Sequence, residues 1–253
     1  MDLGLSDRVY IVTGASRGLG RACAQVLSDE GANLVVASRD ADAITAAAAE
    51  TGGDAVIAMS ADLADPSAPE QLVGAAMGRF QRLDGALISV GGPPAGTAMD
   101  ATDEQWQTAF EAVFLGALRT ARAAARAMSG EGGSIVFVLS SSVKSPIAGL
   151  AISNGLRPGL AMVAKTLADE LGPRAIRVNA VLPGRIDTDR IRELDAGAED
   201  PEAARAATEA AIPLRRYGEP EEFARAAVFL LSPAASYVTG TTLAVDGGAM
   251  RTL

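Results

Sequence analysis

The sequence predicts a doubly wound parallel α/β fold, a single domain of three α/β/α layers over residues 1–253. Short apolar runs alternate along the chain with alanine-rich stretches of helical periodicity. These runs are continuously apolar, which is typical of parallel strands that helices cover on both faces. Neither an internal repeat nor a long low-complexity linker interrupts the pattern. One domain is therefore expected, although this length would permit two.

The predicted elements follow this alternation from end to end. Gly31 ends the first helix, and Thr102–Gln105 forms a capping box that begins a long helix reaching about Met128. We expect strands at Val9–Thr13, Leu34–Ala37, Asp54–Met59, Ala86–Val90, Ser134–Leu139, Ile176–Leu182 and Thr241–Val245. We expect further helices at Gly18–Glu30, Asp42–Glu50, Pro66–Phe80 and Pro220–Leu231, and an apolar helical stripe of Leu160, Val163, Leu167 and Leu171.

Composition excludes several classes of function. The formal net charge of −9 argues against nucleic acid or an anionic membrane as a partner. Histidine is absent and Cys23 is the only cysteine, so no histidine base, internal disulfide or His- or thiolate-ligated metal site is expected. The N-terminal stretch MDLGLSDRVYIVTG resembles neither a signal peptide nor a membrane span, and a cytoplasmic location is expected.

A glycine-rich segment joins the first strand to the first helix. It reads Thr13-Gly14-Ala15-Ser16-Arg17-Gly18-Leu19-Gly20. Glycines permit a tight turn close to a pyrophosphate, and the helix N-terminus offers free N–H groups and the positive end of a dipole. This is the Rossmann-type dinucleotide-binding pattern; an ordinary βα turn is the alternative. The candidate cofactor contacts here are Gly14, Ser16, Arg17, Gly18, Leu19 and Gly20.

The end of the second strand favours NADP(H) over NAD(H). NAD(H) sites usually place an acid there to bind the ribose hydroxyls, but this chain has Ser38 followed by Arg39. Together with Arg17, Arg39 supplies two guanidinium groups suited to a 2′-phosphate. Simple solvation of both arginines is the alternative. Asp62 and Leu63, after the third strand, are equally consistent with a contact to the adenine and with a helix cap.

Four segments of the chain resemble the short-chain dehydrogenase/reductase family. They are Thr13–Gly20, Asn179–Thr188, Arg216–Glu222 and Thr239–Gly248. The resemblance covers nearly the whole chain. It implies a homotetramer or dimer that moves a hydride between NAD(P)(H) and a small carbonyl or alcohol substrate. It also implies that Pro183, Gly184, Ile186 and Thr188 line the nicotinamide end, and that the polar, alanine-rich insertion 186–216 forms a lid over the substrate.

The catalytic residues that the family carries are mostly replaced in this chain. Ser140 matches the family serine, but Ser153 stands where the tyrosine belongs and Arg157 where the lysine belongs. Val113 replaces the helix asparagine. The Asn-Asn-Ala-Gly turn after the fourth strand reads Ile88-Ser89-Val90-Gly91. We therefore predict an atypical active site built from Ser140, Ser153 and Arg157.

The exchange of tyrosine for serine changes the acid chemistry. A phenol has a reference pKa near 10, and an aliphatic hydroxyl lies closer to water, near 15.7. This gap corresponds to roughly 7 kcal/mol in proton-donating strength, so Ser153 is not expected to act as the acid. Arg157 keeps a positive charge that suits the nicotinamide ribose, and no tyrosine lies in a segment from which it could replace the missing one. Because of Pro158-Gly159, we expect the helix to begin near Arg157, which leaves Ser153 on the preceding turn.

Each candidate also has a structural interpretation. Ser140 either polarises a substrate carbonyl or caps the end of a strand, and Arg157 contacts either the cofactor or a structural salt-bridge partner. Lys144 is expected to be a solvated loop residue rather than an acid or anion ligand. Asp187 and Asp189 are expected to be acids at a helix start. We expect Val113 and Trp106 to pack, and Cys23 to be a small buried hydrophobe.

Three functional hypotheses follow from these residues. The first is an NADP(H)-dependent oxidoreductase whose proton comes from water held by Ser140 and Ser153, or from the substrate. The second is a catalytically silent NADP(H)-binding sensor or structural subunit, because the family's proton donor and helix asparagine are missing. The third is a partner-binding scaffold without a cofactor. The intact glycine-rich segment favours the first.

Overall fold

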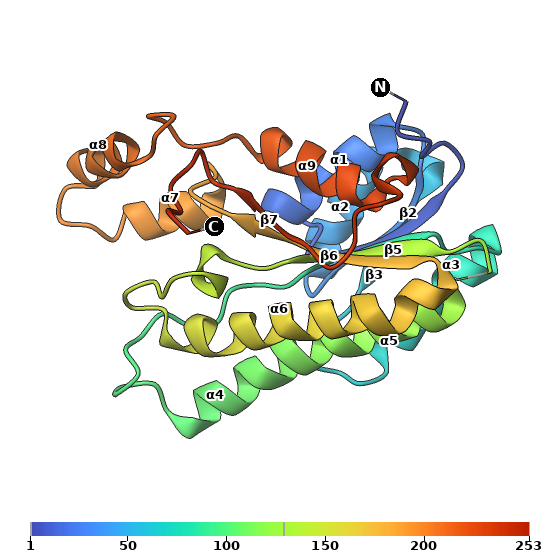
Figure 1. Cartoon of the computed structure of the whole chain (residues 1–253), viewed down its shortest axis with the longest axis horizontal. Coiled ribbons are helices and arrows are strands. Elements are labelled where there is room, and N and C mark those ends of the chain that lie inside the picture. Colours follow the sequence, from blue (N-terminus) through green and yellow to red (C-terminus); the bar gives the residue numbers. More distant parts are fainter. Residues whose placement is uncertain (1, 129, 253) are drawn as a thin grey trace.

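A computed structural model describes residues 2–128 and 130–252, and over these residues seven parallel strands form one sheet between two helical layers (Figure 1). The strand order is β3-β2-β1-β4-β5-β6-β7. The chain moves outward from β1 to β3 and then resumes at β4 on the other side of β1. This reversal is a topological switch point, where ligands bind beyond the carboxyl ends of the strands. The strands are β1 (Val9–Thr13), β2 (Asn33–Ser38), β3 (Val56–Ser60), β4 (Gly85–Ser89), β5 (Gly133–Val138), β6 (Ile176–Pro183) and β7 (Thr242–Val245).

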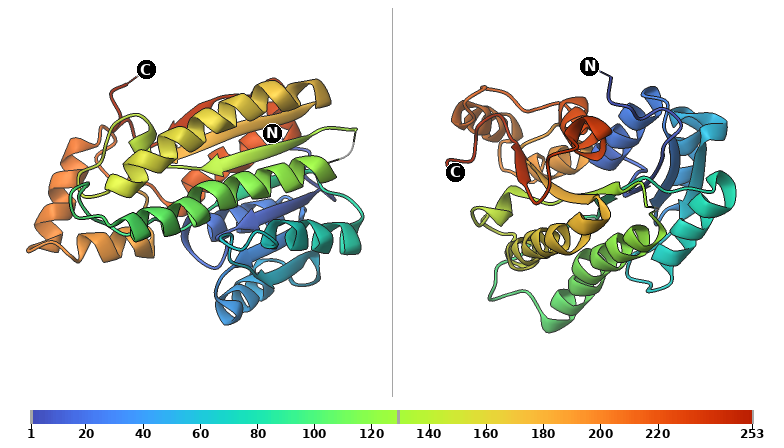
Figure 2. Two further views of the ribbon diagram at one scale, coloured as in Figure 1. Left: turned by 90° about the horizontal axis from the view of Figure 1, so that it is seen from below. Right: turned by 45° about the vertical axis from the view of Figure 1, so that its right-hand side comes forward.

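Helices cover both faces of the sheet, as the continuously apolar strands require. One face carries α1 (Gly18–Asp29), α2 (Ala41–Thr51) and α9 (Pro220–Leu231). The other face carries α3 (Ala68–Phe80), α5 (Gly116–Ala127) and α6 (Ala151–Leu171), which lie side by side in Figure 2. Each layer buries its own apolar cluster against the strands. The predicted three-layer doubly wound fold is confirmed.

The predicted long helix after Thr102 is present but is not uniform. It consists of α4 (Asp103–Ala109), a π-helical segment (Phe110–Leu115) and α5. Thr102 and Gln105 form the expected capping box, in which each side chain accepts a hydrogen bond from the other residue's backbone N–H, at 3.2 and 3.0 Å. The π segment, which the sequence analysis did not predict, changes the helical phase between α4 and α5.

The prediction that the helix begins near Arg157 is wrong. α6 begins six residues earlier, at Ala151, and contains Pro158 in its interior. The turn before the proline is held by tertiary contacts, because the Asn154 side chain donates to the Ile147 carbonyl oxygen at 2.8 Å and accepts from its N–H at 3.0 Å. Ile152 and Leu156 are buried in the same turn. These contacts offset the backbone hydrogen bond that proline cannot make.

The insertion 186–216 folds into two helices, α7 (Asp189–Asp195) and α8 (Pro201–Ala211), which lie at one end of the molecule in Figure 1. Asp187 binds both Arg192 and Arg205, at 2.8 and 3.2 Å, and is therefore an ion-paired residue just before α7. Asp189, by contrast, is the first residue of α7, as an acid at a helix start should be.

Two expectations about single side chains are confirmed. Cys23 is fully buried, and burial raises the pKa of its thiol, which suits a small core hydrophobe. Trp106 packs on α6, where a Cβ at Gly155 would come within 2.6 Å of the indole ring. In the part of the chain that the structure describes, no helix combines the length and the apolar character needed to cross a membrane.

Candidate active site

The glycine-rich loop between β1 and α1 follows a path that only glycine accommodates. Gly14 and Gly18 have φ values of +63° and +57°, in the left-handed region. A Cβ at Gly20 would lie 2.3 Å from the Gly14 carbonyl oxygen. α1 begins at Gly18, and within the described residues its N-cap residue, Arg17, makes no side-chain capping bond. The loop therefore has the shape and the free donors that a pyrophosphate requires.

This loop is fixed to the neighbouring strands. The Thr13 hydroxyl donates to the Ser89 carbonyl oxygen at 2.7 Å and accepts from the Ser89 N–H at 2.9 Å. The Ala15 N–H donates to the Ala37 carbonyl oxygen at 3.1 Å. β1, β2 and β4 are thus held together at their carboxyl ends, so the cradle sits at the switch point.

Arg17 and Arg39, the two arginines predicted to bind a 2′-phosphate, flank this loop. Arg39 is exposed after β2 and has no side-chain hydrogen bond or ion pair among the described residues. Arg17 is also exposed, and its Nη1 lies 3.2 Å from the Glu193 carboxylate on α7. The Ser38 hydroxyl donates to the Asp40 carbonyl oxygen at 3.1 Å. The loop after β2 therefore presents a cation and a hydroxyl, with Asp40 capping α2.

Asp62 and Leu63 follow β3, next to Arg39. One Asp62 carboxylate oxygen accepts from the Ala64 N–H at 3.0 Å, which is a local turn contact that leaves the other oxygen available. The Leu63 side chain belongs to the core. α3 begins at Ala68 and its N-cap residue is Ser67, so the helix-cap interpretation of Asp62 is wrong, and the contact to the adenine stays a prediction.

The segment after β6 meets the glycine-rich loop. A Cβ at Gly18 would lie 3.8 Å from the Thr188 methyl group, which brings the predicted pyrophosphate and nicotinamide residues into contact distance. Gly184 packs against Asp246, and Ile186 is buried beside Gly218. Arg190 of α7, which the sequence analysis did not select, extends toward the segment after β4, and its Nη2 lies 3.9 Å from a Cβ position at Gly92.

Three serine hydroxyls gather where β5 ends. The Ser140 hydroxyl accepts from the Ser142 N–H at 3.1 Å, so it caps the strand end and retains its own proton to donate. Ser153 is buried on the first turn of α6, and its Oγ lies 3.5 Å from the Ser142 Oγ. Ser142 is the residue that sequence reasoning missed, because a buried serine next to Ser140 has no signal of its own in the sequence.

Arg157 lies one turn further along α6 and is 6% exposed. Its Nη1 donates to the carbonyl oxygens of Val138 and Leu139, at 3.1 Å each. Burial lowers the pKa of the guanidinium to about 10, so the group is still charged at neutral pH. Among the described residues no carboxylate pairs with Arg157, so the alternative interpretation, a structural salt bridge, is wrong.

The position expected for the family asparagine is apolar. Val113 lies in the π segment, is 3% exposed, and packs with Ala109, Ile152 and Leu156. A buried apolar cluster therefore fills the space between α4 and α6. The buried members of this cluster, as the structure describes it, offer no polar side chain in place of the family's asparagine.

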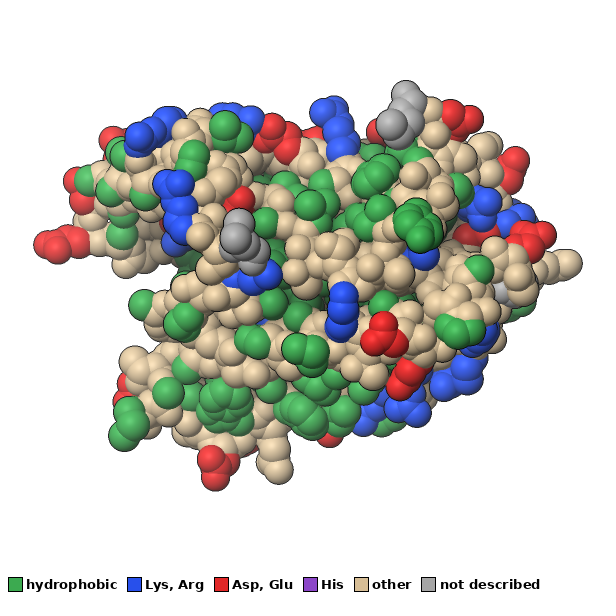
Figure 3. Space-filling model, viewed as in Figure 1, with side chains coloured by type: hydrophobic (Ala, Val, Ile, Leu, Met, Phe, Trp, Pro, Cys, Tyr) green, Lys and Arg blue, Asp and Glu red, His purple; other side chains and the backbone are tan. Residues whose placement is uncertain are grey.

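The end of β5 thus combines hydroxyls and one buried cation. In Figure 3 the surface is hollowed between the end of the molecule that holds α7 and α8 and the loop that follows β5. The three tyrosines of the chain have other surroundings. Tyr10 is buried in β1, the Tyr217 hydroxyl donates to the Asp195 carboxylate at 3.0 Å, and Tyr237 is fully exposed. Such a site can donate hydrogen bonds to a developing oxyanion, but it contains no strong proton donor among these side chains.

Fold and site together define a doubly wound α/β protein with a dinucleotide-type cradle. Residues 14–250 match the family model described as enoyl-(acyl carrier protein) reductase. L-Rhamnose 1-dehydrogenase (NAD(P)(+)) of Azotobacter vinelandii is 40% identical, over 96% of this chain and 97% of its own length. The chain belongs to the short-chain dehydrogenase/reductase family, and its relatives are oxidoreductases.

Two solved structures are informative beside this chain. L-Sorbose reductase from Gluconobacter frateurii, complexed with NADPH and L-sorbose, is 33% identical, covers both chains fully and superposes with a TM-score of 0.93. A short-chain oxidoreductase from Pseudomonas aeruginosa, described as containing an atypical catalytic center, is 27% identical with a TM-score of 0.90, over 99% of this chain and 100% of its own. The family's fold is thus found both with NADPH bound and with an altered centre.

Proposed function

We propose that the protein is an NADP(H)-dependent oxidoreductase acting on a carbonyl or alcohol through an atypical active site. The observation that carries this proposal is the cradle at residues 14–20, whose backbone path excludes side chains and leaves the first N–H groups of α1 uncapped. A loop of this kind suits the pyrophosphate of a dinucleotide. Relatives that act on sugars with NAD(P) support the reaction class.

The charges around the adenosine end favour NADP(H). Arg17 and Arg39 lie at the carboxyl ends of β1 and β2, and no acid follows β2 at the position of Ser38. Two guanidinium groups attract a 2′-phosphate, whereas NAD(H) gains nothing from them. Gly14, Ser16, Gly18, Leu19 and Gly20 would hold the pyrophosphate, Asp62 and Leu63 would adjoin the adenine, and Pro183, Gly184, Ile186 and Thr188 would line the nicotinamide.

The chain's own residues would act on the substrate oxygen. NADPH, when bound, supplies the hydride. Ser140 and Ser153 would donate hydrogen bonds to the oxygen that gains negative charge, and the buried Arg157 cation would stabilise that charge from behind the strand end. Because neither serine is acidic enough to transfer the proton, a water held between their hydroxyls, or an acidic group of the substrate, would supply it.

A second candidate function is a silent NADP(H)-binding protein. It is favoured by the apolar cluster around Val113, which stands at the position expected for the family's helix asparagine. Cofactor binding would then serve sensing or structural support. A scaffold that binds no cofactor is a poorer match, because it leaves the cradle without a role.

Single-turnover mixing with NADPH distinguishes these candidates. A panel of small aldehydes, ketones and keto sugars is mixed with the NADPH complex, and cofactor oxidation is followed by absorbance. We expect oxidation with at least one carbonyl, together with NADPH fluorescence titrations that give tighter binding than NADH. Tight NADPH binding without oxidation by any member of a broad panel supports the silent protein, and absent binding contradicts both.

The proposal includes a homo-oligomer, a dimer or tetramer, located in the cytoplasm. Its structural support is an apolar surface over α4, the π segment and α6 (Figure 3). Phe110 is 39% and Met162 68% exposed, and Phe110 stacks on Phe114, whose ring abuts Gly159. Exposed apolar patches of this kind often mark protein contacts. Light scattering of the purified chain measures the oligomeric state directly.

A further inference from the structure

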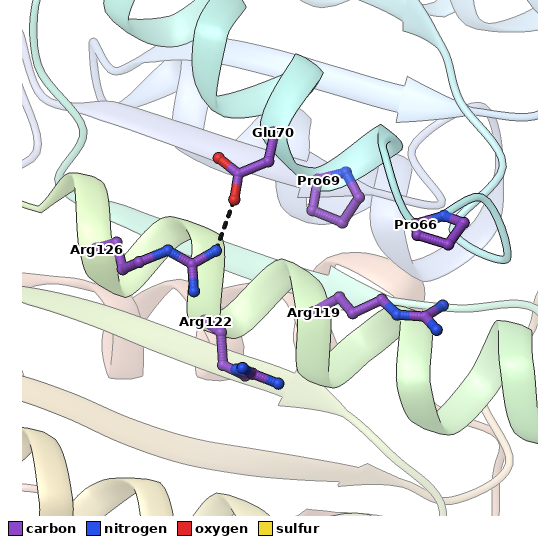
Figure 4. Close-up of a pocket in the computed structure, with 6 residues that line it drawn as sticks. All are labelled: Pro66, Pro69, Glu70, Arg119, Arg122 and Arg126. Carbon is purple, nitrogen blue, oxygen red and sulfur yellow. Dashed lines mark hydrogen bonds and ion pairs between the residues drawn. The ribbon is translucent and has the colours of Figure 1, made fainter.

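A cavity of about 170 Å³ lies outside the candidate active site, between α3 and α5. Its walls are Pro66, Pro69 and Glu70 on one side and Arg119, Arg122 and Arg126 on the other. Figure 4 shows the three arginines on α5: Arg126 reaches Glu70 of α3, whereas Arg119 extends along α5 and Arg122 points away from α3 in this view. None of these residues is used by the proposed oxidoreductase.

The arginines form a ridge of like charge. Arg119 and Arg122 are three residues apart, and Arg122 and Arg126 four, so all three lie on one helical face over about 10 Å. Like charges at these spacings destabilise a helix. Buried alanines such as Ala121 and Ala124 occupy the opposite face and hold this ridge in place. The ridge therefore carries an electrostatic cost that an anion would relieve.

Neighbouring carboxylates neutralise only the two ends of the ridge. Arg126 binds Glu70 at 2.6 Å, and Arg119 binds Glu111 at 3.0 Å. Arg122, in the middle, has no hydrogen bond or ion pair within the described part of the chain. Three guanidinium groups and two carboxylates leave one positive charge at the cavity, in a protein whose formal net charge is −9. α3 also begins here, and its N-cap Ser67 makes no side-chain capping bond.

We infer that this cavity is a second anion-binding site, which takes the phosphoryl group of a small phosphorylated molecule on Arg122. A phosphate accepts hydrogen bonds on several oxygens at once, which matches the planar guanidinium forks of neighbouring arginines. The cavity volume exceeds that of one phosphate group, so part of the attached molecule fits against Pro66 and Pro69. Glu70 competes with the ligand for Arg126.

Calorimetric titration with inorganic phosphate and pyrophosphate tests the inference, with acetate as the carboxylate comparison at constant ionic strength. Excess NADP⁺ is present, so that the glycine-rich loop does not contribute to the signal. We expect saturable binding of phosphate that is weakened about tenfold in Arg122→Ala, the effect of losing one charge-assisted hydrogen bond. Glu70→Gln should strengthen it roughly threefold, because Arg126 is freed.

Arg225→Ala is the matched control, because Arg225 is an exposed arginine on α9, on the other face of the sheet. Its phosphate affinity should equal that of the unmodified protein. The opposite effects of Arg122→Ala and Glu70→Gln separate binding from a general loss of stability, which would weaken both. Absent saturation, equal affinity in Arg122→Ala, or tighter binding of acetate than phosphate would overturn the inference.

Discussion

The glycine-rich loop, which is the proposed cofactor cradle, and the end of β5 lie at the same edge of the sheet. The first is shaped by its backbone and the second by its side chains. The cradle is restricted by its backbone, since Gly14, Gly18 and Gly20 leave no room for side chains. The end of β5 is defined by side chains, namely the hydroxyls of Ser140, Ser142 and Ser153 and the Arg157 cation. Backbone geometry tolerates little change, whereas side chains at a strand end can be exchanged without altering the fold. In this chain, the proposed binding and the proposed chemistry therefore depend on different kinds of structure.

The largest effect is expected from breaking the cradle. In Gly20→Val, the new side chain would collide with the Gly14 carbonyl, which lies 2.3 Å from the Cβ position, and should displace the loop. NADPH affinity, measured by fluorescence, should fall more than about 100-fold, because several backbone donors are lost together. Gly74→Ala is the control: a Cβ there meets nothing within 4 Å, so its affinity should be unchanged. Wild-type affinity in a folded Gly20→Val protein would show that the cradle is not the cofactor site.

At the other region, Ser140→Ala should separate chemistry from binding. Removing this donor should lower kcat on the order of 100-fold while leaving NADPH affinity within about twofold, as for the loss of one oxyanion donor. Ser141→Ala is the matched control, since its hydroxyl makes no side-chain bond among the residues that the structure describes. Equal activity of Ser140→Ala and Ser141→Ala would remove Ser140 from the mechanism.

The pH dependence sharpens the comparison further, because only the end of β5 contains a buried titratable cation. Burial lowers the pKa of Arg157 to about 10, so the charge is present below that pH and is lost as pH rises through it. Activity should accordingly decline above about pH 10. In Arg157→Lys the decline should begin about two units lower, the difference between the reference pKa values of the two side chains. Identical alkaline limits in the two proteins would contradict a role for this charge.

The same pKa shift has a defined consequence for stability. Burial lowers the pKa of Arg157 to about 10 in the folded protein, below its value in the unfolded chain, so above about pH 10 the unfolded state binds more protons. The unfavourable contribution of this buried charge is therefore complete below about pH 10 and diminishes as pH rises above it. Denaturant titrations of the wild type and Arg157→Met across this range measure the difference.

The smallest effect concerns a contact between the glycine-rich loop and α7. Arg17 binds Glu193 of α7, and both side chains are more than half exposed, so the pair itself is worth little. A 2′-phosphate would have to compete with Glu193 for Arg17. Glu193→Gln should raise NADPH affinity about two- to threefold and leave NADH affinity unchanged. An equal gain in affinity for NADPH and NADH would show that the contact between Arg17 and Glu193 limits access to the site rather than recognition of the 2′-phosphate.

Sequence reasoning predicted the fold more fully than the site. Strand and helix positions agreed with the structure to within a few residues, because apolar periodicity and glycine patterns are local signals. The start of α6 was wrong, since Asn154 and its contact with Ile147 outweigh the local preference of Pro158. Ser142 and Arg190 were missed because their positions depend on how distant segments meet. The roles assigned to Ser140, Ser153 and Arg157 stay predictions.

The π segment at Phe110–Leu115 adjusts the phase of one continuous helix. A π turn accommodates one residue more than an α turn, which rotates everything after it by about 100°. Upstream, Trp106 faces Gly155; downstream, the arginine ridge faces α3. An uninterrupted α-helix of the same sequence could place only one of these two faces against its present neighbour. A single-residue deletion within the segment would consequently convert the π turn into an ordinary α turn and leave both halves of the helix facing their present neighbours.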